Sequence, residues 1–347
     1  MAGLVGRISR VGAGCRAMHA PWQVGVLSLT QLRQRHPWQR WSSSVKGSGI
    51  RPGQRLPALR NMLDEGRFVR TIEVHSGFSA LVVDRASGKR QDGSEASFDM
   101  LWSSSLTSSA IKGKPDIETV DTTERVQIVS DVLEVSDKPI LYDGDTGGEK
   151  EVFRFTVKRL ERLGVSGIVI EDKRGLKQNS LFGSERTQLL EDIDVFSEKI
   201  KAGKKAQVTD EFMIFARLEA LIAGLGEEEA LKRARAFVRE GGADGIMIHS
   251  KEKDPGEIFS FLKRYRAEEP NVPVIVVPTT YNSTTEEELK AAGANICIYA
   301  NQLIRASYLA MLDTANKILV AGRSKEVDGQ ILPTKEMITL IDDSASK

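Results

Sequence analysis

The sequence is poor in cysteine and has no long apolar run. Only two of its 347 residues are cysteines, Cys15 and Cys297. Two thiols cannot build a disulfide framework or a multi-cysteine zinc site, and such sparse use of cysteine is typical of a reducing compartment. No stretch of about 18 consecutive apolar residues is present, so the sequence predicts no membrane-spanning helix and no membrane partner.

The first 63 residues lack aspartate and glutamate altogether. They contain nine arginines and one lysine, and the first acidic residue is Asp64. Arginines spread among serines and apolar residues, without acids, are typical of a mitochondrial transit peptide. A disordered basic tail or a mispredicted start is the alternative. We expect residues 1–55 to form a transit peptide and a flexible linker, the linker beginning near Ser42, and the protein to reside in the mitochondrial matrix.

The rest of the chain has the opposite charge balance, with 39 basic against 48 acidic residues. A net negative charge on these residues disfavours binding to the phosphate backbone of nucleic acid, so we expect no nucleic acid as ligand. The length suits either two average domains or one large α/β barrel.

Eight short apolar runs alternate with amphipathic stretches along the body of the chain. Runs such as IVIED, VIVVP and ICIYA are almost continuously apolar, which is typical of parallel strands buried on both faces. They predict strands at Thr71–His75, Phe98–Ser103, Pro139–Asp143, Gly167–Asp172, Phe212–Glu219, Gly245–His249, Val272–Pro278 and Asn295–Tyr299. Cys297 lies within the last of these and is expected in the core.

The intervening helical patterns stop at glycines, as at Gly164, Gly241 and Gly293. Glycine takes the left-handed conformation that ends a helix at little cost. About eight strand–helix units predict a (β/α)8 TIM-type barrel over residues 56–325, followed by a C-terminal extension, 326–347. An open doubly wound sheet is the alternative, weakened because no G-x-G-x-x-G follows the first strand. The polar stretch Asp84–Ser97 predicts a protruding hairpin or loop.

Polar side chains collect where these strands end, which is where a barrel keeps its active site. They are His75, Trp102, Ser103–Ser105, Asp143, Asp145, Glu171, Arg217, Glu219, His249, Thr279 and Asn301. The carboxylates of Asp143, Asp145 and Glu171, without histidine or cysteine partners, suit a hard cation such as Mg²⁺ or Mn²⁺. The alternative is that these carboxylates cap helices or pair with Lys173 and Arg217.

The stretch EDKRGLKQNS, residues 171–180, is long, polar and follows a strand that supplies one of these carboxylates. Lys177, Asn179 and Ser180 are therefore candidates for a lid that closes over a bound substrate; an ordinary surface loop is the alternative. Arg217 can bind an anion through two parallel hydrogen bonds. His249 is a candidate acid, base or ligand contact, although a lone histidine is often structural.

These motifs together resemble those of the phosphoenolpyruvate mutase family, within the isocitrate lyase superfamily. The resemblance covers roughly residues 55–320 and rests on EDK-x4-K-x-N-S, DGDTGG, ARLEALIAG and MIHSK. It implies a Mg²⁺-dependent isomerase that interconverts phosphoenolpyruvate and phosphonopyruvate, which is the first step of phosphonate biosynthesis. It also implies a last barrel helix swapped between subunits, giving dimers that pair into tetramers.

The resemblance also implies roles for individual residues. Asp143, Asp145 and Glu171 match the acidic Mg²⁺ cluster, acting partly through waters. Asp116, ten residues after Leu106, matches the catalytic aspartate. The remaining matches are Trp102, Ser104, Ser105 and Leu106 for the substrate pocket, Arg217 and His249 for substrate contacts, and Lys177, Asn179 and Ser180 for the gating loop, with Asn179 facing the phosphoryl group.

Some features depart from the family pattern and some neighbouring activities stay open. The glycine loop reads DTGG followed by Glu149 in place of DTGYG, Ser105 replaces a glycine, and the 84–97 insertion is extra. The loop after the fourth strand has no cysteine, which disfavours the superfamily's carbon–carbon lyase chemistry. Phosphonopyruvate hydrolase is the closest alternative, and Asn179 favours the mutase. A catalytically silent barrel is the alternative from another class.

Overall fold

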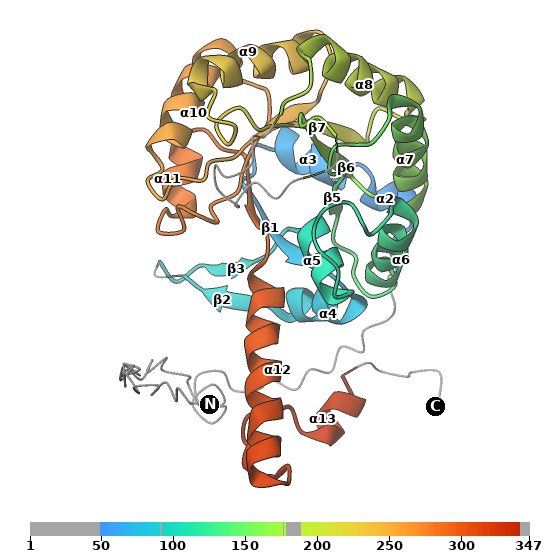
Figure 1. The fold of residues 1–347 in the computed structure, drawn as a ribbon, viewed down its shortest axis with the longest axis vertical. Helices are drawn as coiled ribbons and strands as arrows, with labels where there is room; N and C mark the ends of the chain where they lie inside the picture. Colours follow the sequence, from blue (N-terminus) through green and yellow to red (C-terminus); the bar gives the residue numbers. More distant parts are fainter. Residues whose placement is uncertain (1–48, 91, 176, 178–188, 341–347) are drawn as a thin grey trace, which may run out of the picture.

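The chain folds into a closed barrel of eight parallel strands surrounded by helices (Figure 1). The computed structural model describes residues 49–340 except 91, 176 and 178–188. The barrel strands are β1 (Val69–Val74), β4 (Met100–Ser103), β5 (Ile140–Asp143), β6 (Gly167–Glu171), β7 (Met213–Leu218), β8 (Gly245–Ile248), β9 (Val274–Val276) and β10 (Ile296–Tyr299). The barrel closes where β1 pairs with β10. All eight predicted strands are confirmed, each within a few residues of its expected bounds.

Helices follow the strands and cover the outside of the barrel (Figure 1). They are α4 (Gly77–Arg85), α5 (Ser105–Ile111), α6 (Thr122–Leu133), α7 (Lys150–Leu163), α8 (Ile193–Ala206), α9 (Gly226–Arg239), α10 (Gly256–Glu268), α11 (Glu286–Ala291) and α12 (Gln302–Ala321). Helix α7 ends as predicted at Gly164, which has a φ of 79°. A side chain there would also collide with Pro52, since a Cβ would lie 2.6 Å from the Pro52 Cα.

The barrel interior is filled by apolar side chains from the strands, so the barrel is a packed core and not a pore. Its floor is closed by α3 (Ala58–Asp64), whose Leu59 and Met62 belong to the same buried cluster. A second cluster fills the layer between the strands and the outer helices, and Cys297 lies buried in it as expected.

Helix α2 (Pro52–Arg55) lies within the stretch that we expected to be a flexible linker. Arg55 is buried, its Nη2 donates to the Ser136 carbonyl at 3.1 Å, and its own carbonyl accepts from the Ser166 hydroxyl at 2.9 Å. These bonds satisfy buried polar groups at the base of the barrel and fix this turn in place. Residues 52–55 therefore belong to the fold, although we expected the barrel domain to begin at position 56.

Of the stretch 84–97, predicted as a hairpin or loop, residues 87–97 form a β-hairpin, whereas Asp84 and Arg85 belong to the end of α4. Strands β2 (Ser87–Lys89) and β3 (Glu95–Ser97) pair in antiparallel fashion. Arg90, between them, contacts Glu286 and Glu287 at the start of α11. The hairpin is thus tied to a helix almost 200 residues further along the chain.

Helix α12 projects away from the barrel, and α13 (Thr334–Ile338) lies beside it (Figure 1). No residue of α12 is buried, although the helix carries many large apolar side chains. The buried Glu73 carboxylate accepts from the Ile304 amide at 2.7 Å, which anchors the first turn to β1. In the described part of the chain, no helix is both long and apolar enough to span a membrane.

Candidate functional site

A cavity of about 70 Å³ opens at the carboxyl ends of the barrel strands. Its volume suits a small, compact ligand. Nine of the sequence-predicted site residues line it: Trp102, Ser104, Ser105, Leu106, Asp116, Asp143, Lys177, Arg217 and His249. Thr279 and Asn301, also expected at strand ends, complete the wall together with apolar side chains.

The DGDTGG loop after β5 positions the two aspartates. Asp143 is the last residue of the strand, and Asp145 lies beyond it with a φ of 51°, in the left-handed region that aspartate tolerates better than most residues. The Asp145 carbonyl accepts from the Glu171 amide at 2.8 Å, which fixes the loop against β6. Gly144 is required by packing, because a Cβ there would lie 2.7 Å from the Ile168 Cδ1.

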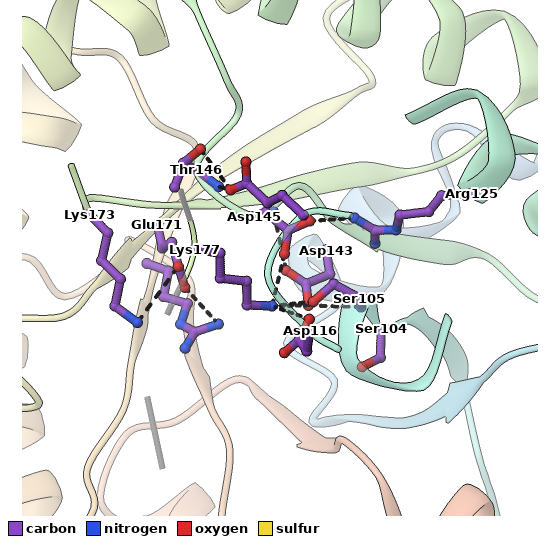
Figure 2. Close-up of polar contacts among 12 residues, drawn as sticks. Ser104, Ser105, Asp116, Arg125, Asp143, Asp145, Thr146, Glu171, Lys173 and Lys177 are labelled. Atoms are coloured by element: carbon purple, nitrogen blue, oxygen red, sulfur yellow. Dashed lines mark hydrogen bonds and ion pairs between the residues drawn. The ribbon is translucent and has the colours of Figure 1, made fainter. Parts of the chain in front are cut away.

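The ammonium group of Lys177 lies among the carboxylates of Asp116, Asp143 and Asp145 (Figure 2). Its Nζ is 2.8 Å from Asp145 Oδ1, 3.2 Å from Asp116 Oδ1 and 3.8 Å from Asp143 Oδ2. It also contacts the hydroxyl of Ser105. Three elements distant in sequence thus meet at one positive charge.

These charges keep one another ionised. Burial would raise the pKa of Asp143, but Lys177, Arg125 and Arg217 outweigh it and hold that pKa well below its usual range. Burial would likewise lower the pKa of Lys177, but the surrounding carboxylates, with Asp143 foremost, raise it. At neutral pH the Asp143 carboxylate is therefore negative and the Lys177 ammonium positive.

Arg125 is a site residue that the sequence argument missed. Its Nη1 donates to Asp145 Oδ2 at 2.8 Å, its Nη2 donates to the Ser103 carbonyl at 3.2 Å, and its guanidinium lies 4.4 Å from the centroid of the Tyr142 ring. The sequence feature that could have identified Arg125 is its position on α6, where it lies on the buried face with Ile128, Val129 and Val132 at helical spacing. An arginine on the apolar stripe of a helix needs a buried acceptor.

Glu118 is a second residue that was missed. Its Oε1 accepts from both the amide and the hydroxyl of Thr146, at 3.2 and 2.9 Å, and so joins the loop that carries Asp116 to the DGDTGG loop. Its φ of 62° is unusual for a residue other than glycine, and strained backbone of this kind is found at functional sites. Burial and the nearby Asp145 charge raise the pKa of Glu118.

Glu171 lies on the other side of the site and has different partners (Figure 2). Its Oε2 is 3.1 Å from Arg217 Nη1, and its Oε1 is 3.6 Å from Lys173 Nζ. Arg217 and Lys173 also contact Glu219, at 2.5 and 3.2 Å. Burial, together with the like charge of Glu219, raises the pKa of Glu171 to about 7 against the opposing effect of the two cations.

His249 is buried in the wall of the cavity. Burial, reinforced by the positive charge of Arg217, lowers its pKa to about 4. The imidazole is therefore neutral at physiological pH. Its Nδ1 is buried and has no hydrogen-bond partner among the residues that the structure describes.

The serine run after β4 serves two different purposes. The amide and hydroxyl of Ser105 donate to Asp143 Oδ2 at 3.1 and 2.8 Å, which orients that carboxylate. Ser104 is the N-cap of α5, and its hydroxyl accepts from the Thr107 amide. Trp102 and Leu106 supply apolar wall. Asn179 and Ser180 lie outside the described residues.

The carboxylates can be tested for their fit to a metal ion. Among the described residues, no group of three or more histidine, cysteine, aspartate or glutamate side chains is arranged to hold a metal. Mg²⁺ does not require one, since it is usually bound through one or two carboxylates and several waters. Asp143 and Asp145 are buried oxygen donors that already surround one cation, the Lys177 ammonium. Their chemistry fits Mg²⁺.

Comparisons with known proteins agree with this architecture. A family model described as phosphoenolpyruvate phosphomutase matches residues 59–319. A phosphoenolpyruvate phosphomutase of Tetrahymena pyriformis is 37% identical over 283 residues, which are 81% of this chain and 89% of the relative.

Two solved structures are also similar. A phosphoenolpyruvate phosphomutase of Streptomyces platensis subsp. rosaceus superimposes with a TM-score of 0.74 at 36% identity, covering 82% of this chain and 93% of that one. A phosphonopyruvate hydrolase in complex with oxalate and Mg²⁺ superimposes with a TM-score of 0.72 at 34% identity, covering 82% and 94%.

Proposed function

Because the chain belongs to the phosphoenolpyruvate phosphomutase family, we propose that it interconverts phosphoenolpyruvate and phosphonopyruvate by moving a phosphoryl group between oxygen and carbon 3. The single observation that carries the proposal is the small cavity whose wall joins a carboxylate cluster to Arg217 and His249. A ligand with both a carboxylate and a phosphoryl group needs cationic and neutral donors side by side, and this cavity offers them.

Arg217 and His249 differ in charge, and so they can make different contacts with the substrate. Arg217, with a pKa raised by its carboxylate neighbours in spite of burial, stays positive and can hold an anionic oxygen of the substrate. The neutral imidazole of His249, in the cavity wall, can donate or accept a hydrogen bond without adding charge. Little covalent help is needed for phosphoryl transfer, because positioning and electrostatic stabilisation dominate its catalysis.

Support for Mg²⁺ comes from the carboxylate donors and from the Mg²⁺ complex of the similar hydrolase. Asp143 and Asp145 would hold the ion, with Glu171 acting through water. When bound, Mg²⁺ supplies Lewis-acid stabilisation of the negative charge that develops on the substrate's enolate oxygen. The Ser105 hydroxyl and amide keep Asp143 oriented for this role.

Two further elements of the proposal concern the whole protein. The apolar face of α12, which includes Tyr308, Leu309, Met311, Leu319 and Val320, is exposed, and a second copy of the chain that exchanges this helix would cover it. We therefore propose swapped dimers that pair into tetramers, which light scattering would test. The acid-free basic start supports import into mitochondria, which amino-terminal sequencing of protein from its native cells would test.

Phosphorus NMR of phosphonopyruvate incubated with the protein and Mg²⁺ tests the activity. The mutase produces the phosphate ester signal of phosphoenolpyruvate, a hydrolase produces inorganic phosphate, and a silent barrel leaves the phosphonate signal unchanged. The 34% identity to a phosphonopyruvate hydrolase makes the second outcome the alternative. The family model and the more similar relative favour the first.

A further inference from the structure

Asp172 directly follows the site residue Glu171, but it is not among the described residues that line the cavity. Its side chain is fully buried. Its Oδ1 accepts from the Glu219 amide at 2.9 Å, and its Oδ2 accepts from the Nη1 of Arg233 at 3.0 Å. The carboxylate therefore connects the chain just after β7 with helix α9.

The Asp172 carboxylate extends the pairing of β6 with β7. Glu171 and Arg217 form the last pair of the register, and the Asp172 amide donates to the Arg217 carbonyl at 3.2 Å. The evenly spaced bonds of a parallel pair would next join the Glu219 amide to the Asp172 carbonyl. That carbonyl instead accepts from the Glu191 amide at 2.8 Å, and the Asp172 side chain accepts from the Glu219 amide in its place. A single side chain thus fixes the backbone at Glu219.

Glu219 is in turn a partner of the arginine in the cavity wall. Its buried Oε1 lies 2.5 Å from the Nε of Arg217, whose Nη1 lies 3.1 Å from Glu171 Oε2. Two carboxylates therefore hold the guanidinium. Asp172 fixes the backbone of both, one through the peptide bond and the other through its side chain. The direction in which a guanidinium donates decides which oxygens of a ligand it can bind.

Arg233 supplies the charge that the buried Asp172 carboxylate needs. Its side chain comes from α9, in the outer layer of helices, and is only 8% exposed. Its Nη1 donates to Asp172 Oδ2 and to the Glu191 carbonyl, each at 3.0 Å, and its Nε donates to Glu229 Oε1 at 2.8 Å. A buried carboxylate that loses such a partner is strongly destabilising. Arg233 therefore holds Asp172 in place from outside the described wall of the cavity.

We propose that Asp172 and Arg233 are positioning residues, which direct the Arg217 guanidinium toward the substrate. They do so by fixing Glu219. The inference rests on the proposed function, which assigns an anionic oxygen of the substrate to Arg217. Because an oxygen that stays anionic throughout the reaction is bound alike in the ground state and the transition state, a misplaced Arg217 should raise KM more than it lowers kcat. Loss of folded protein, in contrast, lowers the apparent kcat and leaves KM unchanged.

The test measures KM and kcat for phosphonopyruvate with Mg²⁺, after circular dichroism has given the folded fraction of each protein. Asp172→Ala removes the acceptor of the Glu219 amide and should raise KM about tenfold. Asp244→Ala is the matched control, because Asp244 accepts from the Ile214 amide at 2.8 Å and from the Nη2 of Arg60 at 3.0 Å, at the opposite end of β7. The control should lose stability but keep the KM of wild type.

Two further proteins separate positioning from support of the fold. Asp172→Leu/Arg233→Met removes the acceptor and both charges together, a replacement that is often neutral for stability. It should raise KM as Asp172→Ala does, and it takes the place of that variant if Asp172→Ala does not fold. In an Arg217→Lys background, Asp172→Ala should raise KM much less than it does in wild type, since the guanidinium that Asp172 positions is gone.

A wild-type KM in the folded Asp172 variants overturns the inference and leaves the proposed function standing. The same holds if Asp244→Ala raises KM as much, or if the increase from Asp172→Ala is equal in the Arg217→Lys background, because Asp172 would then act independently of Arg217. Absence of turnover by the wild-type protein overturns the proposed function and the inference with it.

Discussion

The depressed pKa of His249 predicts a specific loss of stability on mild acidification. Its pKa is about 4 in the folded protein because of burial and the Arg217 charge, whereas an unfolded histidine titrates near 6.5. A group whose folded pKa lies below its unfolded pKa contributes stability that is present above the unfolded value and is lost as the pH falls toward the folded value. The relevant window is therefore about pH 6.5 down to about pH 4.

The magnitude follows from the two pKa values. Each pKa unit corresponds to about 1.4 kcal/mol. Between pH 7 and pH 5 the unfolded chain gains about 0.7 proton at this position and the folded chain about 0.1, and integration over the interval lowers the free energy of unfolding by about 2 kcal/mol from His249 alone. Because His249 is buried, solvent screening does not reduce this figure appreciably.

The assay compares wild type with His249→Gln, which cannot titrate in this range. Urea unfolding at pH 7 and pH 5, at equal protein concentration, should show wild type losing about 2 kcal/mol more than the variant over this interval. The comparison cancels the contributions of all other titrating groups that the two proteins share. Between pH 7 and pH 8, where His249 is neutral in the fold and mostly neutral in the unfolded chain, the two proteins should change almost in parallel. Equal losses between pH 7 and pH 5 would refute the reasoning, since they would mean that His249 accepts a proton in the fold as readily as in the unfolded chain.

Three further predictions concern the charged cluster and the loop beyond it. Asp143→Ala should weaken binding of Mg²⁺ by at least about tenfold in calorimetry, and unchanged affinity would exclude Asp143 as a ligand. Arg125→Met should cost about 3 kcal/mol in urea unfolding because it leaves a carboxylate of Asp145 less compensated, while Arg125→Lys should cost less; equal costs would mean that charge is not the cause. Asn179→Ala should slow turnover of phosphonopyruvate about ten- to a hundred-fold, from the loss of a hydrogen bond to a charged group worth roughly 1.5–3 kcal/mol, and should release more pyruvate and phosphate. A variant with full rate and phosphoenolpyruvate as sole product would remove the main sequence argument for the mutase over the hydrolase.

The barrel was predictable because its signals are local. A strand buried on both faces is apolar along most of its length, and runs such as Ile168–Ile170 and Val274–Val276 show this without any knowledge of their neighbours. Residues directly after such strands were predictable as site residues for the same reason, since all parallel strands end at one rim. The cavity gathers them there.

The sequence analysis did not identify site residues whose role depends on partners distant in the sequence. Arg125 lies in the first turn of α6, and no residue near it in the sequence indicates that Asp145 is its acceptor. Glu118 is equally remote from Thr146. The linker was misjudged at Pro52–Arg55 because glycine and proline favour turns, whereas here Pro52 begins a short helix that the base of the barrel holds in place.

The closed base of the barrel limits how far the amino-terminal segment can be shortened. The carbonyl and guanidinium of Arg55 complete hydrogen bonds of Ser166 and Ser136, and Leu59 and Met62 plug the barrel interior. A chain that begins at Pro52 keeps these contacts, one that begins at Ala58 loses the hydrogen bonds of Arg55, and one that begins after Met62 also exposes the barrel core to water. A shortened chain must therefore retain the segment from Pro52 onward to keep the base of the barrel closed.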